Sequence, residues 1–156
     1  MFSGVKKQTI GYVAWRLAMR LRVSMDRALA PLGLTHAQYS LIASLHGLSA
    51  SEAPTQKQLA DLTGLEPMYV SKLARQLETR GWIERVRDTR DTRAVRLVIT
   101  PEGTEVTREA IAVTGRLLDQ LTAPLGGRNS RRAAEAQAAL EAMLAAPIDI
   151  DPTPGD

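Results

Sequence analysis

Two short helical patterns, separated by a single tight turn, occupy the centre of the chain and leave few folds open to it. The first, QKQLADLT, follows Thr55, which suits a helix N-cap, and precedes Gly64, which suits a helix stop. The second opens at Pro67, a residue favoured in the first turn of a helix, and runs through MYVSKLARQLETR to Gly81. Two short helices joined by a glycine-containing turn predict a helix-turn-helix.

After Gly81 the spacing of the apolar residues changes from about 3.6 to 2, which indicates β-strands. In AVRLVIT every second residue from Val95 to Ile99 is aliphatic, and WIERV offers a partner strand. These segments predict a hairpin with RDTRDTR at its tip. Arginines on a solvent-exposed tip keep their charge hydrated and are free to meet an anionic partner.

Longer amphipathic patterns lie on both sides of this region. Apolar residues recur at helical spacing from Val5 to Leu32, and a second helix capped by Thr35 leads to the loop SASEAP. Another long helix opens at Pro101 and breaks at Pro124, and an Ala-rich helix covers about residues 130–146. The acidic, proline-containing IDIDPTPGD is expected to be disordered. The predicted fold class is therefore mainly α with a small β-hairpin.

Composition excludes several kinds of protein. The 156 residues include no cysteine, which excludes disulfides, Cys-ligated metals and thiol switches. His36 and His46 form no recognisable metal motif, so we expect neither a metal nor another cofactor. No Gly-rich phosphate loop, Ser-His-Asp arrangement or carboxylate pair near a histidine is present, and we expect no enzyme. No apolar run is long enough for a membrane span and no signal peptide is recognisable, so a cytoplasmic location is expected.

The net charge of +3 is unevenly distributed along the chain. Residues 1–34 carry six basic side chains and one acidic one, whereas residues 141–156 carry four acidic side chains and no basic one. A basic chain often has a polyanionic partner, although charge alone fits a merely soluble surface equally well.

The segments LGLTHAQYSLIASL and QLADLTGLEPMYVSKLARQLETRGWIERVRDTRDTRAVRLVITPEG resemble the MarR family of bacterial transcription regulators. The matching features, in order, are the helix-turn-helix, RGWI, DTRDTR and LVITPEG. The resemblance implies a winged helix-turn-helix whose first helix and last two helices build a homodimer, with two recognition helices in successive major grooves. For many members it also implies that a small phenolic or other anionic molecule, bound between the two regions, releases the DNA.

This interpretation divides the chain into dimerisation helices (1–34 and 101–146), a winged helix-turn-helix DNA-binding domain (35–100) and a disordered acidic tail (147–156). It predicts a homodimeric regulator of transcription, a repressor in preference to an activator, on a palindromic operator in double-stranded DNA. A small aromatic or anionic effector is the expected second partner, and no membrane is expected. The alternative is a protein-interaction winged-helix module without DNA binding, which an acidic or apolar recognition face would favour.

The helix that opens at Pro67 is the predicted recognition helix. Its inward positions are Val70, Leu73 and Leu77. Its outward face offers hydrogen-bond donors for base edges, a cation for a phosphate and two side chains that can touch a thymine methyl group. The donors are Ser71, Arg75 and Gln76, the cation is Lys72, and the two side chains for thymine methyl groups are Met68 and Tyr69. An ordinary solvated helix face is the alternative.

Glu66 departs from the preferred N-cap residues of this helix. An acid at this position suits the helix dipole but repels phosphate, so its carboxylate could instead accept from a cytosine amino group.

At the hairpin tip, Arg90 and Arg93 are the predicted minor-groove contacts, because a narrow groove over A·T-rich sequence has an enhanced negative potential. Asp88 and Asp91, each two residues before an arginine, are predicted to pair with a neighbouring arginine and to hold the tip in shape. The resemblance implies these roles for Asp91 and Arg93. The alternative is a loop that mixed charge merely keeps soluble.

The candidate effector residues are aromatic and basic side chains of the first two helices. An aromatic ring near an arginine suits an aromatic carboxylate, although Trp15 and Tyr39 fit a plain core equally. The candidates are Tyr12, Trp15, Arg16 and Met19 on the first helix and Tyr39 and His46 on the second. Oxidant sensing through cysteine is excluded.

Overall fold

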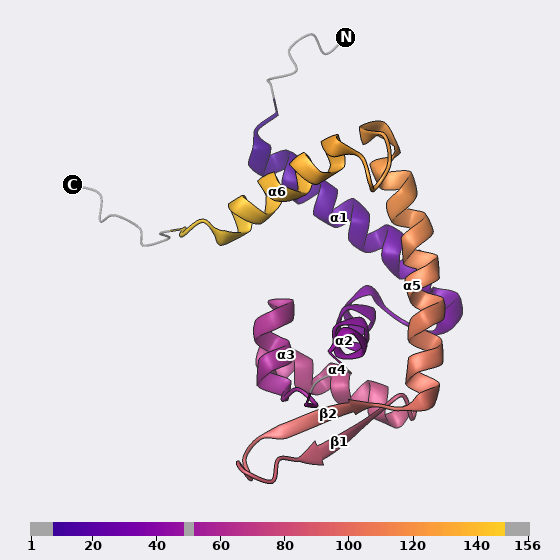
Figure 1. Ribbon diagram of the computed structural model, residues 1–156, viewed down its shortest axis with the longest axis vertical. Helices are drawn as coiled ribbons and strands as arrows, with labels where there is room; N and C mark the ends of the chain where they lie inside the picture. The colour runs from indigo at the N-terminus through magenta and orange to yellow at the C-terminus, as the bar shows by residue number, and fades with distance from the viewer. Residues whose placement is uncertain (1–7, 49–51, 149–156) are drawn as a thin grey trace, which may run out of the picture. The chain divides into compact units, whose positions relative to one another are not determined.

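A computed structural model describes residues 8–48 and 52–148 (Figure 1). It confirms the order and type of every predicted helix and strand in these ranges. The elements are α1 (Ile10–Leu29), α2 (His36–Gly47), α3 (Gln56–Thr63), α4 (Pro67–Thr79), β1 (Ile83–Arg87), β2 (Val95–Ile99), α5 (Pro101–Thr122) and α6 (Arg131–Ala145), with 3-10 turns η1 (Ala30–Leu32) and η2 (Ala123–Leu125). The start of the first predicted helix (5–7), part of the loop after α2 (49–51) and the tail from residue 149 lie outside the described residues.

Side-chain caps fix where the helices begin. The Thr35 hydroxyl accepts from the Gln38 backbone N–H at 3.2 Å, and the Gln38 side-chain oxygen accepts from the Thr35 backbone N–H at 3.0 Å. Thr55 and Gln58 form the same reciprocal pair at the start of α3. Because such a capping box satisfies two backbone donors at once, these starts follow from the sequence alone. Thr9 caps α1, so this helix begins at Ile10 and not at the predicted Val5.

Two glycines lie on either side of α4, the predicted recognition helix. Gly64 ends α3 with φ of 69° and Gly81 follows α4 with φ of 73°, a conformation that other residues adopt at a cost. Between them Pro67 occupies the first turn of α4, where its missing N–H leaves no donor unpaired.

The core of the winged domain lies where α2, α3 and α4 pack against one another and against the hairpin (Figure 1). The predicted inward positions of α4 are confirmed, since Val70, Leu73 and Leu77 are almost completely buried. Burial of one such side chain stabilises the fold by about 1.5–3 kcal/mol. The other large buried residues are Leu41, Ile42 and Leu45 of α2, Leu59 of α3, Ile83 of β1 and Leu97 of β2.

The hairpin is antiparallel, with Ile83 opposite Ile99 and Arg87 opposite Val95. The loop therefore spans residues 88–94, one position later than RDTRDTR. Across β2, the Leu97 N–H donates to the Pro54 carbonyl at 3.0 Å, and Thr55 forms an isolated bridge with Arg96. The chain just before α3 thus pairs with the hairpin, where the sequence indicated only a loop.

Hydrogen bonds of Thr100 hold the start of α5 at the base of the hairpin. The Thr100 hydroxyl donates to the Gly81 carbonyl at 2.7 Å and accepts from the Gly103 N–H at 3.0 Å. Further along α5, Thr107, Ala110 and Thr114 are buried. The first half of this helix is therefore part of the same packed unit as the winged domain.

The chain divides into two compact units after residue 117. In the second unit, η2 follows the end of α5, and Ser130 caps the start of α6. Arg128, between them, pairs with Asp119 at 2.5 Å. Its helix α6 buries Ala133 but exposes Leu140, Met143 and Leu144, the last at 87%. Across residues 8–48 and 52–148, no helix is both long and apolar enough to cross a bilayer.

Candidate nucleic-acid interface

The outward face of α4 is polar and basic at its centre and apolar at its start. Lys72, Arg75 and Gln76 are exposed, and Ser71 is half-buried. Met68 is 82% exposed and Tyr69 41% exposed, although both side chains are large and apolar. Exposed apolar atoms on a polar face suit contact with thymine methyl groups. The face that the sequence predicts is therefore present on one rigid helix.

Two of these side chains already have partners within the protein. An Arg75 guanidinium nitrogen donates to Ser71 Oγ at 3.2 Å, so the two are held side by side on adjacent turns. The Gln76 carbonyl oxygen accepts from Gln38 Nε2 at 3.0 Å, and Gln38 is buried in α2. This hydrogen bond links α4 to α2. It uses the side-chain oxygen of Gln76, so the side-chain NH2 group is the one that could donate to a base.

Glu66 is the N-cap residue of α4 and makes no side-chain cap hydrogen bond. Glu66 is exposed at the start of the helix. The position fits the expected repulsion of phosphate and leaves the acid free to accept from a base.

Asp88 organises the hairpin loop. One carboxylate oxygen accepts from the backbone N–H groups of Arg90 at 2.6 Å and Asp91 at 2.8 Å, and the other pairs with Arg96 Nε. The Asp91 and Arg90 backbone donors, followed by the Arg96 guanidinium, lower the pKa of the Asp88 carboxyl to about 2. The loop is therefore folded around a charged carboxylate.

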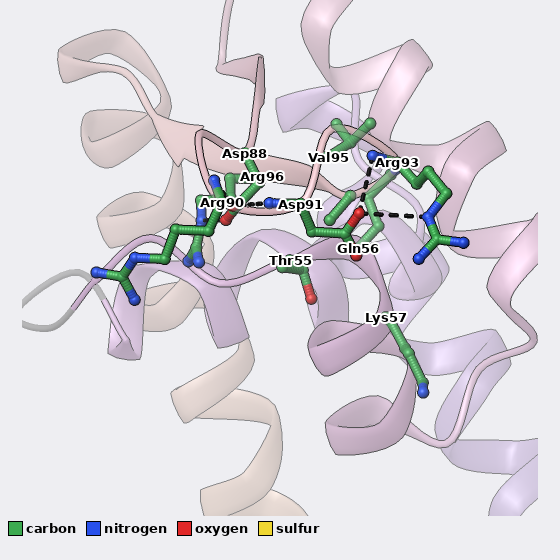
Figure 2. Close-up of a pocket in the computed structure, with 10 residues that line it drawn as sticks. Thr55, Gln56, Lys57, Asp88, Arg90, Asp91, Arg93, Val95 and Arg96 are labelled. Atoms are coloured by element: carbon green, nitrogen blue, oxygen red, sulfur yellow. Dashed lines mark hydrogen bonds and ion pairs between the residues drawn. The ribbon is translucent and has the colours of Figure 1, made fainter.

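Asp91 and Arg93 form the second local pair of the loop, as predicted. The Asp91 carboxylate accepts from the Arg93 backbone N–H at 3.0 Å and lies 3.5 Å from Arg93 Nε. Figure 2 shows Arg90 and Arg93 pointing to opposite sides of the loop, with Lys57 at the edge of the same pocket. The pocket has a volume of about 420 Å³. The side chains of Arg90 and Arg93 are 80% and 92% exposed, so both can reach an external anion.

Asp88 does pair with an arginine and shape the loop, but the prediction that this arginine is a neighbour in the sequence is wrong. Its side-chain partner is Arg96, eight residues away on β2, while Arg90 supplies only a backbone donor. Arg96 also donates to the Ala53 carbonyl and lies 3.3 Å from the Glu52 carboxylate. Sequence reasoning missed both Arg96 and Glu52. The alternation of β2 gives the side on which Arg96 lies, but nothing local indicates its partners before α3.

The candidate effector residues divide between two places in the protomer. The Tyr12 and Trp15 rings lie 6.1 Å apart on α1, and the Arg16 guanidinium lies 6.0 Å from the Tyr12 ring centre. Trp15, Arg16 and Met19 line an open groove of about 500 Å³ along this helix. The described residues that line this groove do not include Tyr39 or His46. The Tyr39 hydroxyl instead accepts from Thr114 Oγ1 of α5 at 2.9 Å.

A second cavity, of about 460 Å³, lies between α1, α2 and the start of α4. Arg22, Asp26, His36 and Tyr69 are among the residues that line it. Burial lowers the pKa of the His36 imidazole, an effect that nearby Asp26 opposes and Arg22 reinforces. This cavity joins the first helix to a residue of the predicted DNA-reading face. Sequence reasoning missed it because its members are separated by up to 47 positions.

Comparison with known proteins gives one consistent result. The MarR family profile matches residues 34–95. The HTH-type transcriptional regulator YdcH of Bacillus subtilis is 33% identical over 117 residues, which cover 74% of this chain and 79% of YdcH. The transcriptional repressor CouR, solved bound to a 23-mer DNA duplex, is 27% identical with a TM-score of 0.75, and the match covers 92% of this chain and 100% of CouR. The S. aureus MepR–DNA complex shares the fold at 22% identity and a TM-score of 0.78, over 88% of this chain and 97% of MepR.

Proposed function

The chain belongs to the MarR family of transcription regulators, and we propose that it is a homodimeric repressor of a palindromic operator in double-stranded DNA, released by a small anionic or phenolic ligand. Regulation of transcription follows from the family. The repressor role, the dimer, the residues that read DNA and the ligand are the proposed parts.

The observation that carries the DNA-binding role is that a loop built around Asp88 exposes two arginines on the same compact unit as the polar face of α4. In the proposed complex, Ser71, Arg75 and Gln76 meet base edges in the major groove and Lys72 meets a phosphate. Met68 and Tyr69 touch thymine methyl groups. Arg90 and Arg93 enter the flanking minor groove, and Asp88 and Asp91 keep the loop in the shape that aims them.

The proposed dimer uses residues 1–34 and 101–146, with residues 35–100 reading the DNA. Exposed apolar side chains on α1 and α6 support this division, since a soluble protomer rarely leaves so many large apolar residues in water. A two-fold dimer would bury them. The residues concerned are Ile10, Val13, Trp15, Leu17 and Val23 on α1 and Leu140, Met143 and Leu144 on α6.

For the effector we propose an aromatic carboxylate whose ring stacks on Tyr12 and Trp15 and whose charge meets Arg16. Ring contacts with one well-placed cation are what a small-molecule site of this chemistry needs. Because the proposed dimer interface also uses α1, a ligand in this groove would change the spacing of the two winged domains. Tyr39 and His46 of α2 do not line this groove in the protomer, so the proposed site is limited to Tyr12, Trp15 and Arg16.

The DNA-binding and dimer parts are tested by selecting duplexes from a randomised pool with the full-length protein. We expect enrichment of an inverted repeat, with half-sites about 10 base pairs apart from centre to centre, bound by two protomers in analytical ultracentrifugation. A pool without enrichment would contradict DNA recognition and favour a protein-interaction module. A reporter with the selected repeat across its promoter separates the two regulatory roles, because only a repressor lowers its output.

The ligand part is tested on the selected duplex with benzoate and 4-hydroxybenzoate as probes. We expect the probes to weaken binding by the wild-type protein but not by the Arg16→Ala variant. Arg22→Ala is the matched control, since it removes an arginine of the same helix that lines the other cavity. Loss of the response in the control alone would move the effector to that cavity, and no response in the wild type would contradict release by an aromatic carboxylate.

A further inference from the structure

Three arginines in and beside the hairpin loop are less free than the sequence indicates, because each has an acidic partner. Arg96 pairs with Asp88, Arg93 with Asp91, and Arg90 with Glu52. The positive charges of these three arginines are therefore each offset by a carboxylate in the protein without DNA.

Glu52 is the one of these three acids that lies outside the hairpin. It precedes α3, and one of its carboxylate oxygens lies 3.8 Å from Arg90 Nη2 and 3.3 Å from Arg96 Nη2. A single oxygen thus faces two guanidinium groups. The Glu52 side chain is 60% exposed, so it lies at the surface that the loop presents to solvent.

The ion pairs differ in how easily a phosphate could replace the acid. Arg96 is only 20% exposed and also holds Asp88 and the Ala53 carbonyl, so it stays inside the protein. Arg90 is 80% exposed, and an exposed pair at 3.8 Å contributes little to stability. Arg90 can therefore leave Glu52 for DNA without unfolding the loop, which Asp88 continues to hold.

We propose that Glu52 is an affinity-setting residue that competes with DNA for Arg90 and weakens the binding of the loop to DNA whatever its base sequence. This inference rests on the proposed DNA-binding function. Each binding event must separate Arg90 from Glu52 and place the Glu52 carboxylate near the polyanion. Since the attraction of a cation to the DNA polyanion depends little on the order of the bases, the acid weakens binding to all duplexes of the same composition alike. Discrimination between the operator and other DNA of that composition is left to the side chains that read bases and to the minor-groove contact of Arg93.

The test is the Glu52→Gln variant, which keeps the size of the side chain and removes its charge. One further effective cation steepens the plot of log K against log salt by about 0.9, which at 0.1 M salt corresponds to about three- to tenfold tighter binding for each protomer. We expect this gain, measured by fluorescence anisotropy, on both the selected duplex and a scrambled duplex of the same composition. Glu105→Gln is the matched control, because Glu105 also pairs with an arginine, Arg108, but lies on α5.

Arg90→Ala and the double variant Glu52→Gln/Arg90→Ala test the mechanism. With Arg90 absent, the gain from Glu52→Gln should fall to within about twofold, since the arginine for which Glu52 and the DNA compete is gone. A gain of unchanged size in the Arg90→Ala background, an equal gain in the Glu105→Gln control, or no gain at all would overturn the proposal. These outcomes presuppose that the wild-type protein binds the selected duplex. Failure of the selection itself would instead contradict the proposed function.

Discussion

Replacing Gly103 with alanine should destabilise the protein, although alanine is the better helix former. Gly103 is buried in the first turn of α5. A Cβ atom there would overlap the Trp82 carbonyl oxygen, and it would lie 2.8 Å from the Trp82 carbonyl carbon and 3.1 Å from Ile99 Cγ1. The Trp82 carbonyl cannot move away freely, because it accepts from the Thr100 N–H at 3.0 Å. The substitution must therefore shift α5 away from the hairpin.

The size of the effect follows from three contributions. Alanine in a helix is favoured over glycine by about 1 kcal/mol. Overpacking costs about 1–3 kcal/mol, and loss of the hydrogen bond between Thr100 and Trp82 costs about 0.5–1.5 kcal/mol. We expect a net loss of about 1–3 kcal/mol in the free energy of unfolding, or roughly 2–12 °C in Tm for a chain of this length.

The control is Gly47→Ala, at the last residue of α2, where an added Cβ would meet no atom within 4 Å. This variant should be neutral or up to about 1 kcal/mol more stable. Both are compared with the wild type by urea and thermal unfolding at one protomer concentration, because dimerisation makes Tm depend on concentration. A Gly103→Ala variant as stable as the wild type would refute the close approach of α5 to the hairpin.

Two further predictions concern the loop and the proposed dimer. Because the folded-state pKa of Asp88 is about 2, below its ordinary value of 3.8, the stabilising effect of its carboxylate is complete above about pH 4 and is lost as the pH falls through 2. Its ¹³C carboxyl resonance should titrate with that midpoint, and a midpoint near 3.8 would mean that the loop is not built around Asp88. Leu144→Glu should leave the fold intact, since the leucine is 87% exposed in the protomer, and should shift the protein toward monomer in analytical ultracentrifugation. An unchanged dimer would exclude this part of α6 from the interface.

A single substitution tests the dimer better than removal of residues 101–156. Thr107, Ala110 and Thr114 of α5 are buried with the winged domain, and Thr114 bonds to Tyr39. Ending the chain at Thr100 would remove these contacts, so a loss of DNA binding could reflect unfolding of the domain. The sequence alone does not indicate this, because Tyr39 and Thr114 are 75 residues apart.

Most of the fold could be predicted because its signals are local. Thr35 with Gln38, and Thr55 with Gln58, set helix starts within four residues, and the spacing of Val70, Leu73 and Leu77 sets the buried face of α4. The change of period after Gly81 marks the hairpin for the same reason.

The parts of the site that could not be predicted depend on contacts across long stretches of chain. Arg96 reaches the Ala53 carbonyl across 43 residues, and Gln76 meets Gln38 across 38 residues. The charge pattern indicates the loop arginines and Asp91, but it does not indicate Glu52, which comes from another part of the chain. The sequence shows that the segment is basic. The fold determines which of its arginines are already paired with acids and which are available to DNA.

The central claim, that α4 reads bases while the hairpin loop reads the backbone and the minor groove, is tested most directly by a salt series on the selected palindrome. Wild type, Arg75→Ala and Arg93→Ala are compared on the palindrome with A·T-rich and with G·C-rich flanks. Arg75→Ala should cost about 1–3 kcal/mol and relax base preference within the half-site. Arg93→Ala should lose the preference for A·T-rich flanks and make the slope of log K against log salt shallower by roughly one per protomer. An Arg93→Ala variant with unchanged affinity, slope and flank preference would contradict the claim and leave the loop as a merely solvated turn.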